Sequence, residues 1–122
     1  MGSAPADAER YFLIESKMRT YFDCSGSVSR EAFELVPEDA TEVFLFDSKV
    51  YGPYSRQDAM KAMSLYFGGT DYREVWAHLE SNPTPLSVMV ITDGFGPDLE
   101  LAPSFVKIVE IPASYGFGVN KM

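Results

Sequence analysis

Apolar side chains near the beginning of the chain recur at intervals of three and four residues. These positions are Tyr11, Ile14, Met18, Tyr21 and Phe22. This is the period of a helix with one buried face, so the pattern predicts a helix from Ala8 to Phe22, ended by turn-forming residues at 23–27 (DCSGS). Residues 1–6 (MGSAPA) are predicted to be a disordered N-terminal segment, and residues 7–122 to form a single domain.

Two more helices are predicted from serine caps. A short helix runs from near Ser29 to Leu35, with Ser27 or Ser29 as its cap, and is closed by Pro37. Ser55 is followed three residues later by Asp58, which is similar to a capping box and marks the start of a longer helix. That helix carries an apolar face and ends at the glycine pair 68–69.

Three segments in the first two thirds of the chain have strand character. Residues 41–46 (TEVFLF) are rich in β-branched and aromatic side chains, and a short second strand begins at Val50. Residues 72–80 (YREVWAHLE) alternate between two faces, with Trp76 and His78 on the same one. The sequence predicts a strand there.

The last third of the chain predicts two more strands. Residues 86–92 (LSVMVIT) are apolar on both faces, as in a central strand, and residues 105–111 (FVKIVEI) form the final one. No helical pattern separates the segments after Thr70, so we expect an antiparallel meander. The predicted fold is α+β, with N-terminal helices packed on a curved, mainly antiparallel sheet.

Three short motifs accompany this order of elements: PEDA at 37–40, GPYSRQDAM at 52–60 and VKIVE at 106–110. With them the chain resembles the NTF2-like superfamily, which includes ketosteroid isomerases and SnoaL-type polyketide cyclases. The resemblance implies a cone-shaped fold with an interior pocket. It also implies that an enzyme of this kind would place an acid or base near the first strand. The domain would form a homodimer through its sheet face, to which Tyr72, Trp76 and His78 would contribute.

Composition narrows the function classes. Ten Lys and Arg against 18 Asp and Glu give a net charge of −8, which argues against nucleic-acid binding because phosphate contacts need clustered basic residues. No apolar run approaches the ~20 residues that span a bilayer, and none is typical of a signal peptide, so we expect a cytoplasmic protein without a membrane partner. The single cysteine excludes an internal disulfide.

Candidate chemistry is sparse. His78 is the only histidine and can serve as an acid or base near neutral pH, although an ordinary histidine on a sheet has the same pattern. Asp47, beside the predicted strand 41–46, is a second candidate catalytic residue. Residues 93–98 (DGFGPD) lack the features of a phosphate loop and the spacing of an EF-hand, and predict a turn. No metal site and no cofactor are predicted.

Three functions are compatible with these features. The first is a binding domain for an apolar small molecule or a protein partner, which is not clearly catalytic. Its predicted pocket is lined by Tyr11, Met18, Phe46, Tyr54, Met63 and Trp76. The second is an isomerase, cyclase or dehydratase that transfers protons through His78 or Asp47. The third is a structural assembly module whose acidic edge, Glu31 to Asp47, meets a basic partner.

Overall fold

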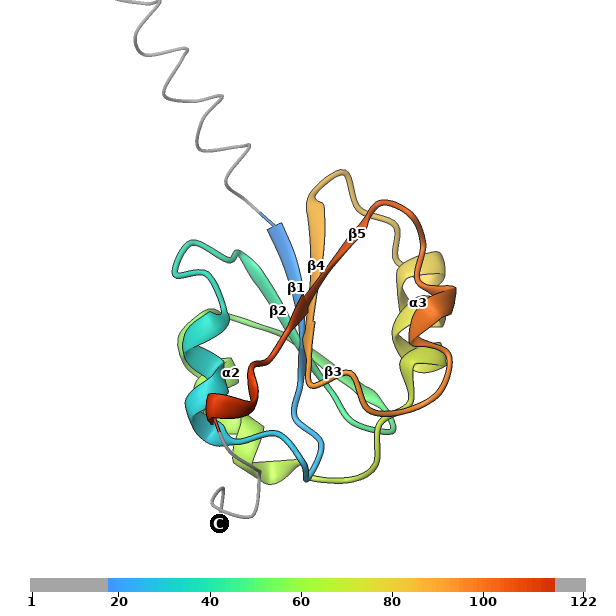
Figure 1. Ribbon diagram of the computed structural model, residues 1–122. Helices are drawn as coiled ribbons and strands as arrows, with labels where there is room; N and C mark the ends of the chain where they lie inside the picture. Colours follow the sequence, from blue (N-terminus) through green and yellow to red (C-terminus); the bar gives the residue numbers. More distant parts are fainter. Residues whose placement is uncertain (1–17, 116–122) are drawn as a thin grey trace, which may run out of the picture.

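The computed structural model describes residues 18–115, and its centre is a five-stranded sheet. The strands are β1 (Met18–Asp23), β2 (Glu42–Phe46), β3 (Val50–Tyr54), β4 (Ser87–Thr92) and β5 (Val106–Glu110), in the spatial order β3-β2-β1-β4-β5 (Figure 1). β1 is parallel to β2 and to β4, and β4 is parallel to β5. β3 pairs antiparallel with β2. The sheet is therefore mixed and mostly parallel.

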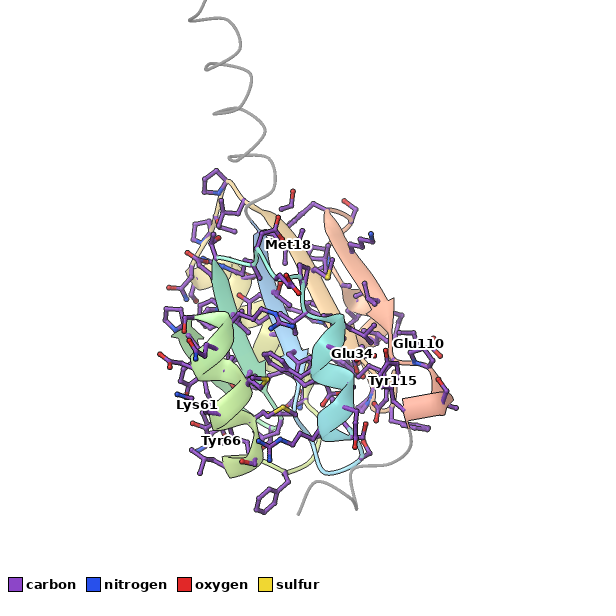
Figure 2. All side chains as sticks on the ribbon, turned by 90° about the vertical axis from the view of Figure 1, so that its left-hand side faces the viewer. Met18, Glu34, Lys61, Tyr66, Glu110 and Tyr115 are labelled. Atoms are coloured by element: carbon purple, nitrogen blue, oxygen red, sulfur yellow. The ribbon has the colours of Figure 1, made fainter. Side chains whose placement is uncertain are left out.

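Helices cover both faces of this sheet. The 3-10 helix η1 (Arg30–Leu35), helix α2 (Arg56–Ala62) and the 3-10 turn η2 (Met63–Leu65) pack on one face, and α3 (Tyr72–Ser81) packs on the other (Figure 1). Figure 2 shows η1 and α2 side by side in front of the sheet. Short 3-10 turns, η3 (Leu99–Leu101) and η4 (Ala113–Tyr115), precede and follow β5, and the Tyr115 hydroxyl donates to Glu34 of η1 (2.5 Å).

The two faces bury two separate apolar clusters, and β1 contributes to both. Phe22 joins the cluster beneath η1 and α2, with Phe33 and Met63. Tyr21 joins the cluster beneath α3, with Tyr72 and Val75. Residues 19–23 of β1 are all buried, as expected for a parallel strand covered on both sides. None of the helices in residues 18–115 is long and apolar enough to cross a membrane.

Several local predictions are confirmed. The segments 41–46, 86–92 and 105–111 contain β2, β4 and β5, and β4 is indeed central because β1 and β5 flank it. The predicted short helix is η1, and the predicted cap at Ser55 begins α2, since its Oγ accepts the backbone N–H of Asp58 (3.1 Å).

The predicted helix from Ala8 to Phe22 is wrong for residues 18–22, which belong to β1; its earlier residues lie outside the part of the chain that the structure describes. The helical spacing of Met18, Tyr21 and Phe22 is coincidental. A strand buried on both faces has no alternation to reveal it, so periodicity alone cannot separate it from a buried helix.

The predicted strand at 72–80 is also wrong, because these residues form α3. Asp71 caps the helix by accepting the backbone N–H of Arg73 (3.1 Å). The buried positions Tyr72, Val75 and Leu79 follow helical spacing, and the apparent alternation of the segment was a weaker signal.

These two errors overturn the predicted fold class. α3 supplies a crossover between β3 and β4, so the later strands are parallel and no antiparallel meander forms. The observed fold is an α/β sheet with helices between strands and on both faces. It is not the curved, mainly antiparallel cone with N-terminal helices that the NTF2-like resemblance implied, and the assignment to that superfamily is wrong.

Candidate functional site

The candidate site lies at the carboxyl ends of β1 and β4. From β1 the chain continues to β2, which lies next to β1 in the sheet. β4 and β5 come later in the chain and extend the sheet from the opposite edge of β1. β1 and β4 therefore flank the point at which the order of parallel strands reverses, where ligands bind in open α/β sheets. Two polar segments follow these strands: 23–27 (DCSGS) after β1 and 92–94 (TDG) after β4.

Three side-chain oxygens form a connected row across this crevice. Ser25 Oγ lies 3.3 Å from Ser27 Oγ, and Ser27 Oγ donates to Asp93 Oδ2 at 2.5 Å. The serines come from the loop after β1, and Asp93 follows β4. The two loops are thus joined through groups that are themselves good ligands for a hard cation.

Asp23 lies directly behind this row and is fully buried. Its Oδ1 accepts the backbone N–H of Ser25 (2.9 Å), and its Oδ2 accepts the hydroxyl of Thr92 (2.7 Å). Burial raises the pKa of Asp23 to about 6 and the charge of Asp93 adds to the shift, although the hydrogen bonds from Ser25 and Thr92 oppose it. Within residues 18–115 no basic side chain forms an ion pair with Asp23 or Asp93.

A buried hydroxyl network fixes the loop after β4. Tyr72 of α3 is fully buried, and its hydroxyl bonds to Thr92 Oγ1 (2.7 Å) and donates to the backbone carbonyl of Phe95 (2.8 Å). Burial raises the pKa of Tyr72 to about 12, so its hydroxyl stays a donor at neutral pH. Gly96 has φ +115°, and a Cβ there would lie 3.2 Å from the ring of Tyr72, so glycine is required.

A pocket of about 190 Å³ opens beside the oxygen row. Its polar groups come from Ser27, Asp93 and the exposed Glu110, and its apolar wall includes Phe95 and Ile111. The residues that line it include no lysine, arginine or histidine. The pocket is therefore electronegative, and it gives solvent access to the oxygen row.

The donor set fits Mg²⁺ better than zinc. In residues 18–115 no three His, Cys, Asp or Glu side chains gather closely enough to hold a metal by themselves. Mg²⁺ is usually held by one or two carboxylates and keeps several waters, and in an octahedral site neighbouring oxygens are about 2.9 Å apart. The separations of 3.3 and 2.5 Å within the row bracket that value.

The two predicted catalytic residues are not brought together. His78 lies on α3, where its Nδ1 is 2.7 Å from the Tyr21 hydroxyl. The centroid of its ring lies 4.5 Å from the ring centroid of Phe44. Burial lowers the pKa of His78, and the charge of Arg19 lowers it further. Asp47 follows β2 at the same edge of the sheet as Asp23, and accepts hydrogen bonds from its own turn and from Gly68. The catalytic role of each residue stays a prediction.

The residues of the predicted pocket lie on both sides of the sheet. Met63 and Tyr54 pack in the cluster beneath α2, and Phe46 and Trp76 in the cluster beneath α3. Met18 begins β1, and Tyr11 lies outside the described residues. The structure does not gather them around one cavity. The proposed dimer residues Tyr72, Trp76 and His78 belong to α3 and not to a sheet face; the homodimer itself stays a prediction.

Sequence reasoning missed Asp23, Ser25, Ser27 and Thr92, and assigned Asp93 only to a turn. The signal was present: small polar residues follow two apolar segments directly, in DCSGS and in TDG. It went unused because residues 18–22 were interpreted as a helix. Two polar segments converge only if both strands are parallel neighbours.

The comparisons with known proteins add no assignment. No protein-family model matches the chain, and neither the curated proteins nor the solved structures give a significant match.

Proposed function

We propose that this chain is a divalent-cation-binding domain, with Mg²⁺ as the favoured ion. Ser25, Ser27 and Asp93 would supply oxygen ligands, and Asp23 would provide the second negative charge, directly or through a water. The proposal differs from the sequence-based hypothesis of a domain that binds an apolar small molecule or a protein partner, because the ligand is a cation and the site lies at an edge of the sheet.

The observation that carries the proposal is the buried charge of Asp23 without a compensating cation. Buried charges in proteins are paired or coordinate metals, because an isolated ion loses its hydration. Asp23 is fully buried, Asp93 adds a second carboxylate nearby, and neither has a basic partner in the described part of the chain. A bound divalent cation would neutralise both groups.

The surroundings favour binding over chemistry. Enzymes of phosphoryl transfer generally place lysine or arginine around the transferred group in addition to a metal, and the residues that line this pocket include no basic side chain. The one thiol nearby, Cys24, is buried and donates to the carbonyl of Phe46 (3.3 Å). Positions of the cation that face the pocket would be open to an oxygen-bearing ligand, so binding of such a partner would depend on the cation.

Titration calorimetry tests the proposal on chelator-treated protein with MgCl₂, MnCl₂ and CaCl₂. We expect saturable binding of one ion, and a raised melting temperature with bound ion. Ser27→Ala removes one oxygen and should weaken binding roughly tenfold or more, since a bond to a charged group contributes about 1.5–3 kcal/mol. Ser87→Ala is the matched control, because Ser87 is exposed at the opposite end of β4.

Absence of binding by the wild-type chain would overturn the proposal. So would equal affinities for wild type and Ser27→Ala, because the ion would then lie elsewhere on this acidic protein.

A further inference from the structure

A third segment, residues 68–71, lies against both ligand loops. The backbone N–H of Gly26 donates to the carbonyl of Gly68 (3.1 Å), which ties the segment to the loop after β1. On its other side the segment meets the loop after β4, since a Cβ on Gly96 would lie 3.4 Å from the carbonyl oxygen of Thr70. The position of this segment therefore sets the spacing of both loops.

One residue, Asp47, holds both ends of that segment. Its Oδ2 accepts the backbone N–H of Gly68 (3.1 Å), and its backbone carbonyl accepts the N–H of Asp71 (2.9 Å). Its Oδ1 accepts the N–H of Lys49 (3.0 Å) and the hydroxyl of Tyr51 (3.0 Å). Asp47 is only 5% exposed, so solvent does not replace these donors.

We propose that Asp47 is a positioning residue for the cation site: it anchors residues 68–71, and through Gly68 and Gly26 it sets the geometry of the loop that carries Ser25 and Ser27. This inference rests on the proposed function. This role differs from the catalytic one that the sequence predicted for Asp47, because the two carboxylate oxygens of Asp47 already accept hydrogen bonds from three donors of the protein itself.

The test is Asp47→Asn, with Tyr51→Phe as the matched control. The amide oxygen of the variant can still accept from Lys49 and Tyr51, and its NH₂ group then faces the N–H of Gly68, donor against donor, so the Gly68 end of the segment is released. Tyr51→Phe removes one hydrogen bond to the same carboxylate and leaves the Gly68 contact intact. Gly68→Ala is a second variant, whose Cβ would crowd Asp47 Oδ2 at 3.2 Å.

Mn²⁺ affinity and Tb³⁺ luminescence lifetimes in H₂O and D₂O are the two measurements, made where each variant is fully folded. We expect Asp47→Asn to weaken Mn²⁺ binding by about 10–100-fold, as loss of an outer-shell contact does, and to admit more water to the Tb³⁺ coordination sphere. Tyr51→Phe should keep the wild-type affinity and water count. If Asp47→Asn does not fold, Gly68→Ala should show the same two changes to a lesser degree.

The outcomes separate the two proposals. If wild type binds Mn²⁺ and Asp47→Asn binds it equally with an unchanged water count, the positioning role is refuted and the cation site stands. If Asp47→Asn and Tyr51→Phe weaken binding equally, the effect is general destabilisation and the role is again refuted. If wild type binds no ion, the proposed function fails and this inference fails with it.

Discussion

β1 carries a buried charged residue near each end, and the surroundings of the two charges differ. At the beginning, Arg19 is 6% exposed; its Nε donates to Glu42 (2.7 Å) and its Nη1 to the carbonyl of Asn82 (2.6 Å). Its guanidinium also lies 5.3 Å from the ring centroid of Phe44. At the other end, Asp23 is fully buried among hydrogen-bond donors and has no cationic partner in the described chain.

The comparison separates a structural charge from a functional one. The fold supplies a carboxylate and a carbonyl to Arg19, so that charge is compensated once the protein has folded. The fold supplies Asp23 with another carboxylate instead, which increases the electrostatic cost. A local conflict of this kind is typical of functional sites, where stability is lost in favour of binding.

The largest effect is expected from Asp23→Asn. The amide is uncharged, and the Thr92 hydroxyl can turn to accept from its NH₂ group, so the cost of the buried charge disappears. We expect Mg²⁺ binding to be abolished, while the metal-free protein gains about 1–3 kcal/mol of unfolding free energy at neutral pH. Calorimetric titration and urea denaturation without metal measure the two quantities.

Ser29→Ala at a buried hydroxyl without a hydrogen-bond partner is a suitable control, since it lies outside the oxygen row. A metal-free Asp23→Asn protein that is less stable than wild type would contradict the comparison, because Asp23 would then stabilise the fold as Arg19 does.

At the compensated end, Arg19→Met should have the opposite consequences. It leaves the buried Tyr21 hydroxyl and the carbonyl of Asn82 without this donor, and such losses cost about 3–5 kcal/mol when one partner of a buried pair is removed; the half-exposed position of Glu42 favours the lower end. Urea denaturation checks the loss. Mg²⁺ affinity of the folded variant should equal that of wild type, and a weakened affinity would show that the two ends are not independent.

How much of this could be predicted from the sequence depended on how local each signal was. The composition of 41–46 and 86–92 and the Ser55 cap act within a few residues, and β2, β4 and α2 are where they predict. β1 could not be identified in this way, because its burial on both faces is a property of the assembled sheet. In YREVWAHLE, the alternating and helical patterns share Tyr72 and Trp76, and only packing decides between them.

The site could not be predicted without the correct assignment of those two elements. Asp23 and Asp93 are 70 positions apart in the chain, and only the parallel pairing of β1 with β4 brings their loops together. With an antiparallel meander, DCSGS and TDG would have no reason to meet. Residue type alone points to His78 and Asp47, whereas the residues of the site are distinguished by their place at strand ends.

Tyr72→Phe tests the contact between α3 and the loop after β4, beside Asp23, and should have a smaller effect on Mg²⁺ binding. It removes the hydroxyl that bonds to Thr92 and donates to the carbonyl of Phe95, at a cost of about 0.5–1.5 kcal/mol for each hydrogen bond lost. We expect Mg²⁺ affinity to fall about tenfold, at the low end for an outer-shell contact. Tyr51→Phe serves as a hydroxyl deletion remote from this loop, and equal affinities for the two variants would show that Thr92 and its loop need no support from α3.

The smallest effect is a difference in pH dependence between the two ends. The raised pKa of Asp23, about 6, means that its contribution to metal-free stability is present at low pH and is lost as the pH rises through 6. The lowered pKa of His78 has the opposite sign: its contribution is present above the unfolded value of about 6.5 and is lost as the pH falls. Urea denaturation of wild type, Asp23→Asn and His78→Gln at pH 7.5 and pH 5 should therefore show that the stability advantage of Asp23→Asn becomes smaller on acidification, whereas His78→Gln improves relative to wild type. If either variant keeps the same stability difference from wild type at both pH values, the group that it replaces titrates as it does in the unfolded chain.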